Sequence, residues 1–185
     1  MEERNAVLRK NLDTLHWAAL SGAVCIVLAL IPFVNMIAFL VALVAAAMSF
    51  VAMYRLREIH DDFHTAFMLV MINIPLKILE GLLGAGAESV VDLICSVVSF
   101  AQVYFIVRAI NYLLRLESRN DIADRGEQVV RLYVLNLVVG VAAAAVTLLL
   151  GVSSIAAVML IVSLIVSIVA VVAYIKYLGA AKECF

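Results

Sequence analysis

Hydrophobic residues fill six long stretches of the chain, and short polar or small-residue segments separate these stretches. Runs such as VMLIVSLIVSIVAVVAYI lack the alternation of polar and apolar positions that is typical of membrane β-barrel strands. About 20 apolar residues form a helix long enough to cross a lipid bilayer. The pattern therefore predicts an all-α polytopic membrane protein. Its six transmembrane helices are expected at about Leu15–Ile31, Val34–Tyr54, Phe63–Leu83, Ser89–Val107, Val129–Leu150 and Ser154–Ile175.

Composition supports this class of protein. Hydrophobic residues make up 66% of the chain and charged residues 15%, whereas soluble domains contain about 45–50% and about 25%. The formal net charge is −1, so we expect the lipid bilayer as the surroundings and no nucleic acid as a partner. We expect one transmembrane domain over residues 1–185 and no cofactor.

The distribution of basic residues predicts the orientation. All of the 13 lysines and arginines except Lys77 lie in the N-terminal segment, the second and fourth connectors or the C-terminal tail. Because basic residues gather on the cytoplasmic side of membrane proteins, both termini are expected in the cytoplasm. We expect the protein to be integral to a cell membrane, and specifically to a bacterial plasma membrane.

The predicted helices form three tandem hairpins, at about 15–54, 63–107 and 129–175, with a cytoplasmic connector at about 108–128. Each hairpin has a short outer tip, and its second helix ends in an aromatic and a basic residue, as at Tyr54 and Arg55. This similarity favours a triplicated hairpin. Short loops in any helical membrane protein would also give a two-helix period.

The middle hairpin differs from the other two because its outer part carries charge. Polar residues recur on one face of its first helix and on one face of its second, which together would form a stripe. Ionisable residues in a membrane usually face a cavity or a bundle interior. We therefore predict a binding site for a solute or an ion. Its residues are Asn73, Lys77, Glu80, Glu88, Asp92, Ser99 and Gln102.

A simpler interpretation of the same residues stays open. The middle hairpin could be short, with residues 76–92 in the outer headgroup layer and their charges in water. Its serines could serve helix packing, because Ser163 and Ser167 stand at the positions of Ser96 and Ser99 in the third hairpin.

A second polar constellation is EIHDDFH, at residues 58–64. His60 and His64 have the i, i+4 spacing with which two imidazoles on a helical turn share a metal. The sequence has no HExxH motif and no cysteine nearby, so these histidines are weak candidates for a metal site. Histidine and acidic residues are also ordinary at a membrane surface, where Asp61 and Asp62 could cap a helix.

Three functions are consistent with these patterns. The leading hypothesis is the binding or transport of a small solute, cationic or amine-bearing because the charged cluster is net acidic, through an outward-facing polar cavity in the middle hairpin. The alternative is a non-catalytic subunit or scaffold that assembles with a larger membrane protein or with copies of itself. The third is a metal-dependent lipid enzyme that uses His60 and His64. We identify no catalytic residues, so an enzyme is the least favoured class.

Overall fold

Helices account for all of the regular structure that the computed structural model describes, which covers residues 2–28, 35–82, 85–150 and 154–185. Within these ranges some side chains lie outside the described part, among them those of residues 77–82 and 85–90. The helices are α1 (Glu2–Leu28), α2 (Asn35–Leu56), α3 (Asp61–Leu82), α4 (Ala85–Leu116), α5 (Asn120–Leu150) and α6 (Ser154–Lys182). The prediction of an all-helical protein with six helices is confirmed.

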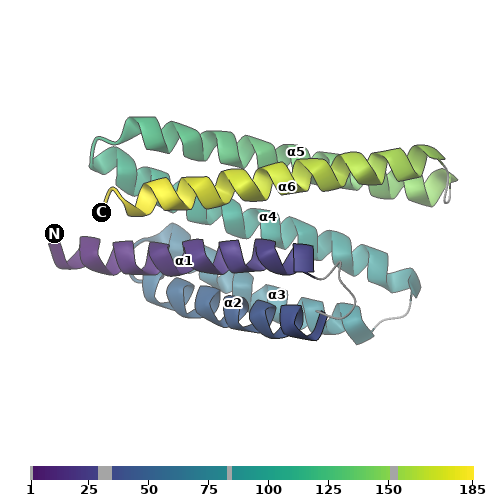
Figure 1. The fold of residues 1–185 in the computed structure, drawn as a ribbon, viewed down its shortest axis with the longest axis horizontal. Coiled ribbons are helices and arrows are strands. Elements are labelled where there is room, and N and C mark those ends of the chain that lie inside the picture. The colour runs from purple at the N-terminus through teal and green to yellow at the C-terminus, as the bar shows by residue number, and fades with distance from the viewer. Residues whose placement is uncertain (1, 29–34, 83–84, 151–153) are drawn as a thin grey trace.

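Each helix packs on its neighbours in the chain, as short connections between helices require. The most extensive contacts join α1 to α2, α3 to α4 and α5 to α6, and further contacts join α4 to α5 and α2 to α3. Packing of α6 on α1 closes the arrangement into a ring. Both chain termini lie at the same end of the molecule, which we call the terminal end (Figure 1). The opposite end is the tip end.

Four helices contain segments that are long and apolar enough to cross a membrane. These segments are Phe39–Leu56, Val91–Leu116, Asn120–Thr147 and Ala157–Lys182. Large apolar side chains along them are exposed, for example Phe39 and Ile161. Exposure of so much apolar surface is unfavourable in water, so these helices indicate a membrane protein. The six-span topology and the cytoplasmic position of the termini stay predictions.

The helices extend beyond the predicted spans at the terminal end. The connector expected at about 108–128 is reduced to residues 117–119, because α4 continues to Leu116 and α5 begins at Asn120. Ser118 turns the chain with φ of 59°, and the Arg119 N–H donates to the Leu114 carbonyl at 2.9 Å. The apolar pattern stops where the bilayer is expected to stop, but a helix continues into polar surroundings if its sequence favours helix.

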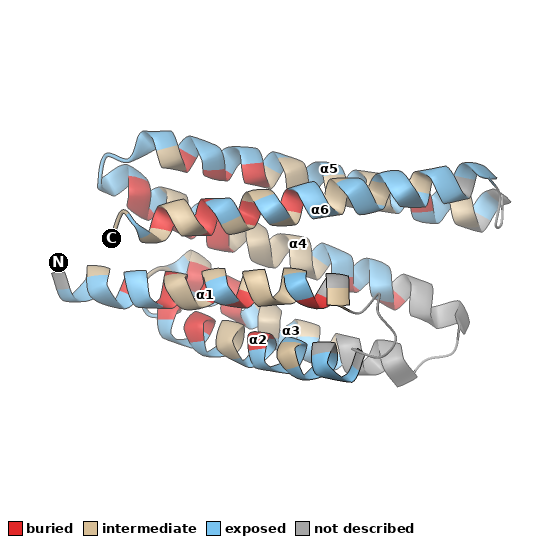
Figure 2. Ribbon diagram, in the orientation of Figure 1, coloured by how far each residue is buried: buried red, intermediate tan, exposed pale blue. Residues whose placement is uncertain are grey.

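The hydrophobic core is concentrated at the terminal end (Figure 2). Every helix contributes to it, through Leu8 and Leu12 of α1, Met53 and Leu56 of α2, Phe63 of α3, Ile110 and Leu114 of α4, Ala123 of α5 and Leu178 of α6. Polar contacts reinforce the same end: the Lys182 ammonium donates to the Asp13 carboxylate at 2.7 Å, joining α6 to α1.

Candidate functional site

A cavity of about 800 Å³ lies between α4, α5 and α6, within their apolar segments. Many of the side chains that line it are polar, although the helices are otherwise apolar. The polar lining residues are Asp92, Ser96, Ser99 and Gln102 of α4, Tyr133 and Asn136 of α5, and Ser163 and Ser167 of α6. We call this space the α4–α6 cavity.

Helical spacing places these residues on facing surfaces. On α4 the lining positions recur at intervals of three and four residues, which keeps them on one side of the helix. Gly140, Ala143 and Ala144 line the α5 side, and their small side chains leave room. Gly140 itself lines the space, and a Cβ atom on it would make an ordinary contact, at 3.9 Å, with the Ser163 hydroxyl oxygen.

The lining offers hydrogen-bond donors and acceptors and one carboxylate. Serine hydroxyls and the amides of Gln102 and Asn136 both donate and accept. Among the described lining residues, Asp92 is the only acidic or basic one. Polar groups inside a membrane are costly unless they are satisfied by one another, by water or by a ligand. The lining can form hydrogen bonds with a small polar molecule.

Three of the seven predicted site residues line this cavity, namely Asp92, Ser99 and Gln102. A fourth, Asn73 of α3, is joined to them because its amide nitrogen donates to the Ser99 hydroxyl at 3.1 Å. The Asn73 carbonyl oxygen is buried and has no hydrogen-bond partner among the described residues. The predicted Lys77, Glu80 and Glu88 have side chains outside the described part of the structure.

The third hairpin supplies lining residues that the sequence interpretation left out of the site. Tyr133 and Asn136 are not among the predicted site residues, and helix packing is the predicted role of Ser163 and Ser167, yet all four line the cavity. The signal in the sequence was the recurrence of Ser96 and Ser99 at equivalent positions of α6. The structure brings these serines of two hairpins to one space, with α5 between them in the chain.

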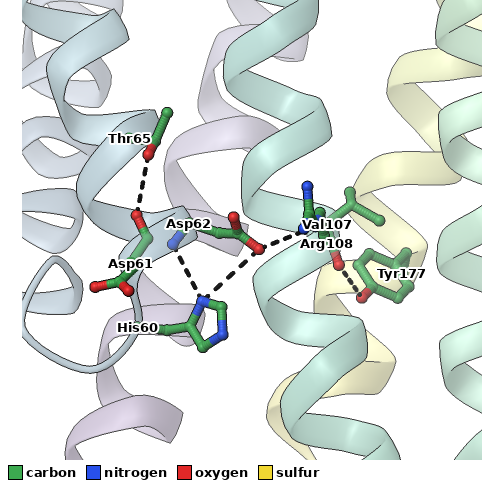
Figure 3. A network of polar contacts seen from close by, with 7 residues as sticks. All are labelled: His60, Asp61, Asp62, Thr65, Val107, Arg108 and Tyr177. Carbon is green, nitrogen blue, oxygen red and sulfur yellow. Dashed lines mark hydrogen bonds and ion pairs between the residues drawn. The ribbon is translucent and has the colours of Figure 1, made fainter.

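The histidine constellation at residues 58–64 forms a helix cap. His60 precedes α3, and its Nδ1 accepts a hydrogen bond from the Asp62 N–H at 3.1 Å (Figure 3). Its carbonyl accepts from the Phe63 N–H, so His60 itself holds the N-cap position, with Asp61 and Asp62 in the first turn. His64 is exposed one turn later. Among the described residues no group of three or more His, Cys, Asp or Glu side chains could hold a metal ion.

Replacing His60 with alanine is expected to destabilise the protein by about 1 kcal/mol, because the Asp62 N–H loses its acceptor. His60→Asn should restore the stability, since asparagine is a favourable N-cap residue. Unfolding in mixed micelles by a denaturing detergent measures both. His64→Ala, at an exposed position of the same helix, is the control with an expected change within about 0.5 kcal/mol. Equal losses for His60→Ala and His64→Ala would contradict the capping role.

The fold and the cavity together define a class: a helical membrane protein with a polar space among its apolar helices. No family model matches the chain, and no curated protein or solved structure matches it either. What the protein does must therefore be inferred from its own residues.

Proposed function

We propose that the protein binds and transports a small cationic or amine-bearing solute in the α4–α6 cavity. The observation that carries this proposal is a space of about 800 Å³ with a polar lining inside apolar helices. Known ligand sites in proteins have volumes of about 300–1,000 Å³ and few polar groups for orientation. The volume exceeds what an amine of a few carbon atoms needs, so bound water would fill the rest.

The charge preference rests on Asp92. Asp92 carries the only carboxylate among the described lining residues. A carboxylate attracts a cation, and the attraction is stronger in a low-dielectric environment than in water. Ser99, Gln102 and Asn136 would supply oxygen atoms that accept hydrogen bonds from an ammonium group. Asn73, which donates to Ser99, would fix the position of that hydroxyl.

Ligand-dependent thermal stabilisation of the purified protein tests the proposal. The probes are methylammonium, ethanolamine and putrescine, each paired with a neutral alcohol of similar size. A ligand at 100 times its Kd stabilises the folded state by about 2.7 kcal/mol, so at least one amine should raise Tm while its alcohol does not. Asp92→Asn is expected to weaken the binding of that amine at least about tenfold. Asp124→Asn, an exposed change on α5, should leave its affinity unchanged.

Blocking the space gives an independent control. Gly140→Leu would project its side chain into the cavity, whereas Gly22→Leu would meet nothing within 4 Å of its Cβ atom. The first variant should lose the amine response and the second should keep it. If no amine stabilises the protein, or if Gly140→Leu retains the full response, solute binding in this cavity is contradicted. The alternative of a non-catalytic subunit, which predicts co-purification with a larger membrane protein, would then be favoured.

A further inference from the structure

A second cavity, of about 630 Å³, lies at the terminal end between the beginning of α3 and the facing sides of α4 and α5. Its lining carries three arginines, Arg108, Arg115 and Arg131, against two acidic residues, Asp62 and Glu127. We call it the arginine cavity. It is distinct from the α4–α6 cavity, and the two share no lining residue.

Both acidic side chains are already engaged with arginines. Asp62 Oδ2 lies 3.3 Å from Arg108 Nε (Figure 3). The Asp62 side chain is 15% exposed and the Arg108 side chain 59%. Arg115 Nη2 donates to Glu127 Oε1 at 2.5 Å. Arg131 is exposed and pairs with no acidic side chain among the described residues. One guanidinium is thus in excess, and the exposed arginines have N–H groups beyond those in the two pairs.

Two neutral side chains add donors with fixed orientation. The Tyr177 hydroxyl donates to Asn111 Oδ1 at 2.7 Å, which leaves the Asn111 amide nitrogen as the group that can donate. The amide rests against Gly126, where a Cβ atom would lie 2.2 Å from Asn111 Oδ1. His60 accepts at Nδ1, so its neutral ring carries the hydrogen on Nε2. Both side chains line the arginine cavity.

We propose that the arginine cavity binds a phosphate group. A surplus of guanidinium and amide donors, with the carboxylates occupied, selects an anion, and the planar fork of arginine matches two oxygens of a phosphate. The apolar segments of α4 and α5 reach this level of the molecule, so a bilayer that these segments cross would have phospholipid headgroups near it. Basic pockets between transmembrane helices bind such headgroups. The phosphate belongs either to an anionic phospholipid or to a soluble phosphate compound.

Native mass spectrometry of the full-length protein in detergent, titrated with phosphatidylglycerol or phosphatidylcholine, tests the proposal. The wild type should retain phosphatidylglycerol in preference to phosphatidylcholine. Arg131→Gln is expected to weaken phosphatidylglycerol binding about tenfold, as the loss of one charge-assisted hydrogen bond implies. Arg125→Gln is the matched control, because Arg125 is exposed on the same helix and is not among the lining residues. It should bind like the wild type.

A competition with inorganic phosphate at millimolar concentration distinguishes the two sources. Displacement of phosphatidylglycerol by phosphate supports a site for soluble phosphate compounds, and resistance supports a lipid site; both support a phosphate-binding cavity. Equal loss of binding in Arg131→Gln and Arg125→Gln would overturn the proposal, because surface charge alone would then explain the binding. Equal retention of the two lipids by the wild type, with no displacement of either by inorganic phosphate, would overturn it too. None of these results depends on the amine response of the α4–α6 cavity.

Discussion

A cysteine at Ser163 is expected to react with a charged, membrane-impermeant methanethiosulfonate reagent far faster than a cysteine at Ile161. Both residues lie on α6 within the segment Ala157–Lys182, but Ser163 lines the α4–α6 cavity. Ile161 is 58% exposed on the outer, apolar surface. If that surface faces lipid, a thiol there neither ionises nor meets a charged reagent. If the lipid surroundings raise the thiol pKa by about two units, the thiolate fraction and the reaction rate fall by a factor on the order of a hundred.

The reaction is best measured in proteoliposomes with a background that lacks the natural cysteines. Cys25 and Cys95 are buried, and Cys184 is half-buried. Burial raises the pKa of the Cys184 thiol, and Asp121 and Glu183 act in the same direction while Arg119 opposes them. Replacing all three, with serine at Cys184 and alanine at the others, removes the natural thiols. Faster labelling at position 161 than at position 163 would contradict both the lipid-facing surface and the water-filled cavity.

Replacing Gly126 with valine is expected to destabilise the protein by about 2–5 kcal/mol. A Cβ atom at this position would lie 2.2 Å from Asn111 Oδ1 and 2.7 Å from Asn111 Nδ2, so the amide must move. The buried hydroxyl of Tyr177 would then lose its partner at 2.7 Å. The free energy of unfolding, measured in mixed micelles, reports the loss.

Gly22→Val is the control for this prediction, because nothing lies within 4 Å of a Cβ atom there. It should change the stability much less. A double-mutant cycle identifies the cause: in a Tyr177→Phe background, where the hydrogen bond to Asn111 is already absent, Gly126→Val should cost less than in the wild type. Equal costs in the two backgrounds would rule out displacement of Asn111 as the mechanism.

Much of the fold follows from the apolar pattern, and its failures have physical causes. Long unbroken runs such as that of α6 predict helices directly, because only helices satisfy their own backbone groups in a membrane. The predicted spans stop at Val107 and resume at Val129, whereas α4 continues to Leu116 and α5 begins at Asn120, since charge marks the edge of a bilayer and not the end of a helix. The pattern begins this helix at about Phe63, with Asp61 and Asp62 as possible caps, but α3 begins at Asp61 and His60 is the cap that accepts from the Asp62 N–H.

The candidate site was harder to predict because charge drew attention to one hairpin. The spacing along α4 predicts Asp92, Ser99 and Gln102 as site residues, and they line a cavity. The other walls come from α5 and α6, where neutral Asn136 and Ser163 give only a faint signal among apolar neighbours. The packing of the hairpins on one another decides which helices face each other across a space. Periodicity within one helix carries no information about this packing.

The one-sided core has a mechanical consequence. Buried apolar residues join all six helices at the terminal end. The long helices are therefore fixed at that end, which is the fulcrum about which they can tilt. Helix α5 has 31 residues and extends about 46 Å. A tilt of about 5° at the fulcrum would displace its far end by about 4 Å over that length. Small adjustments of packing around the arginine cavity would therefore be amplified at the other end of the molecule, where the hairpin tips lie.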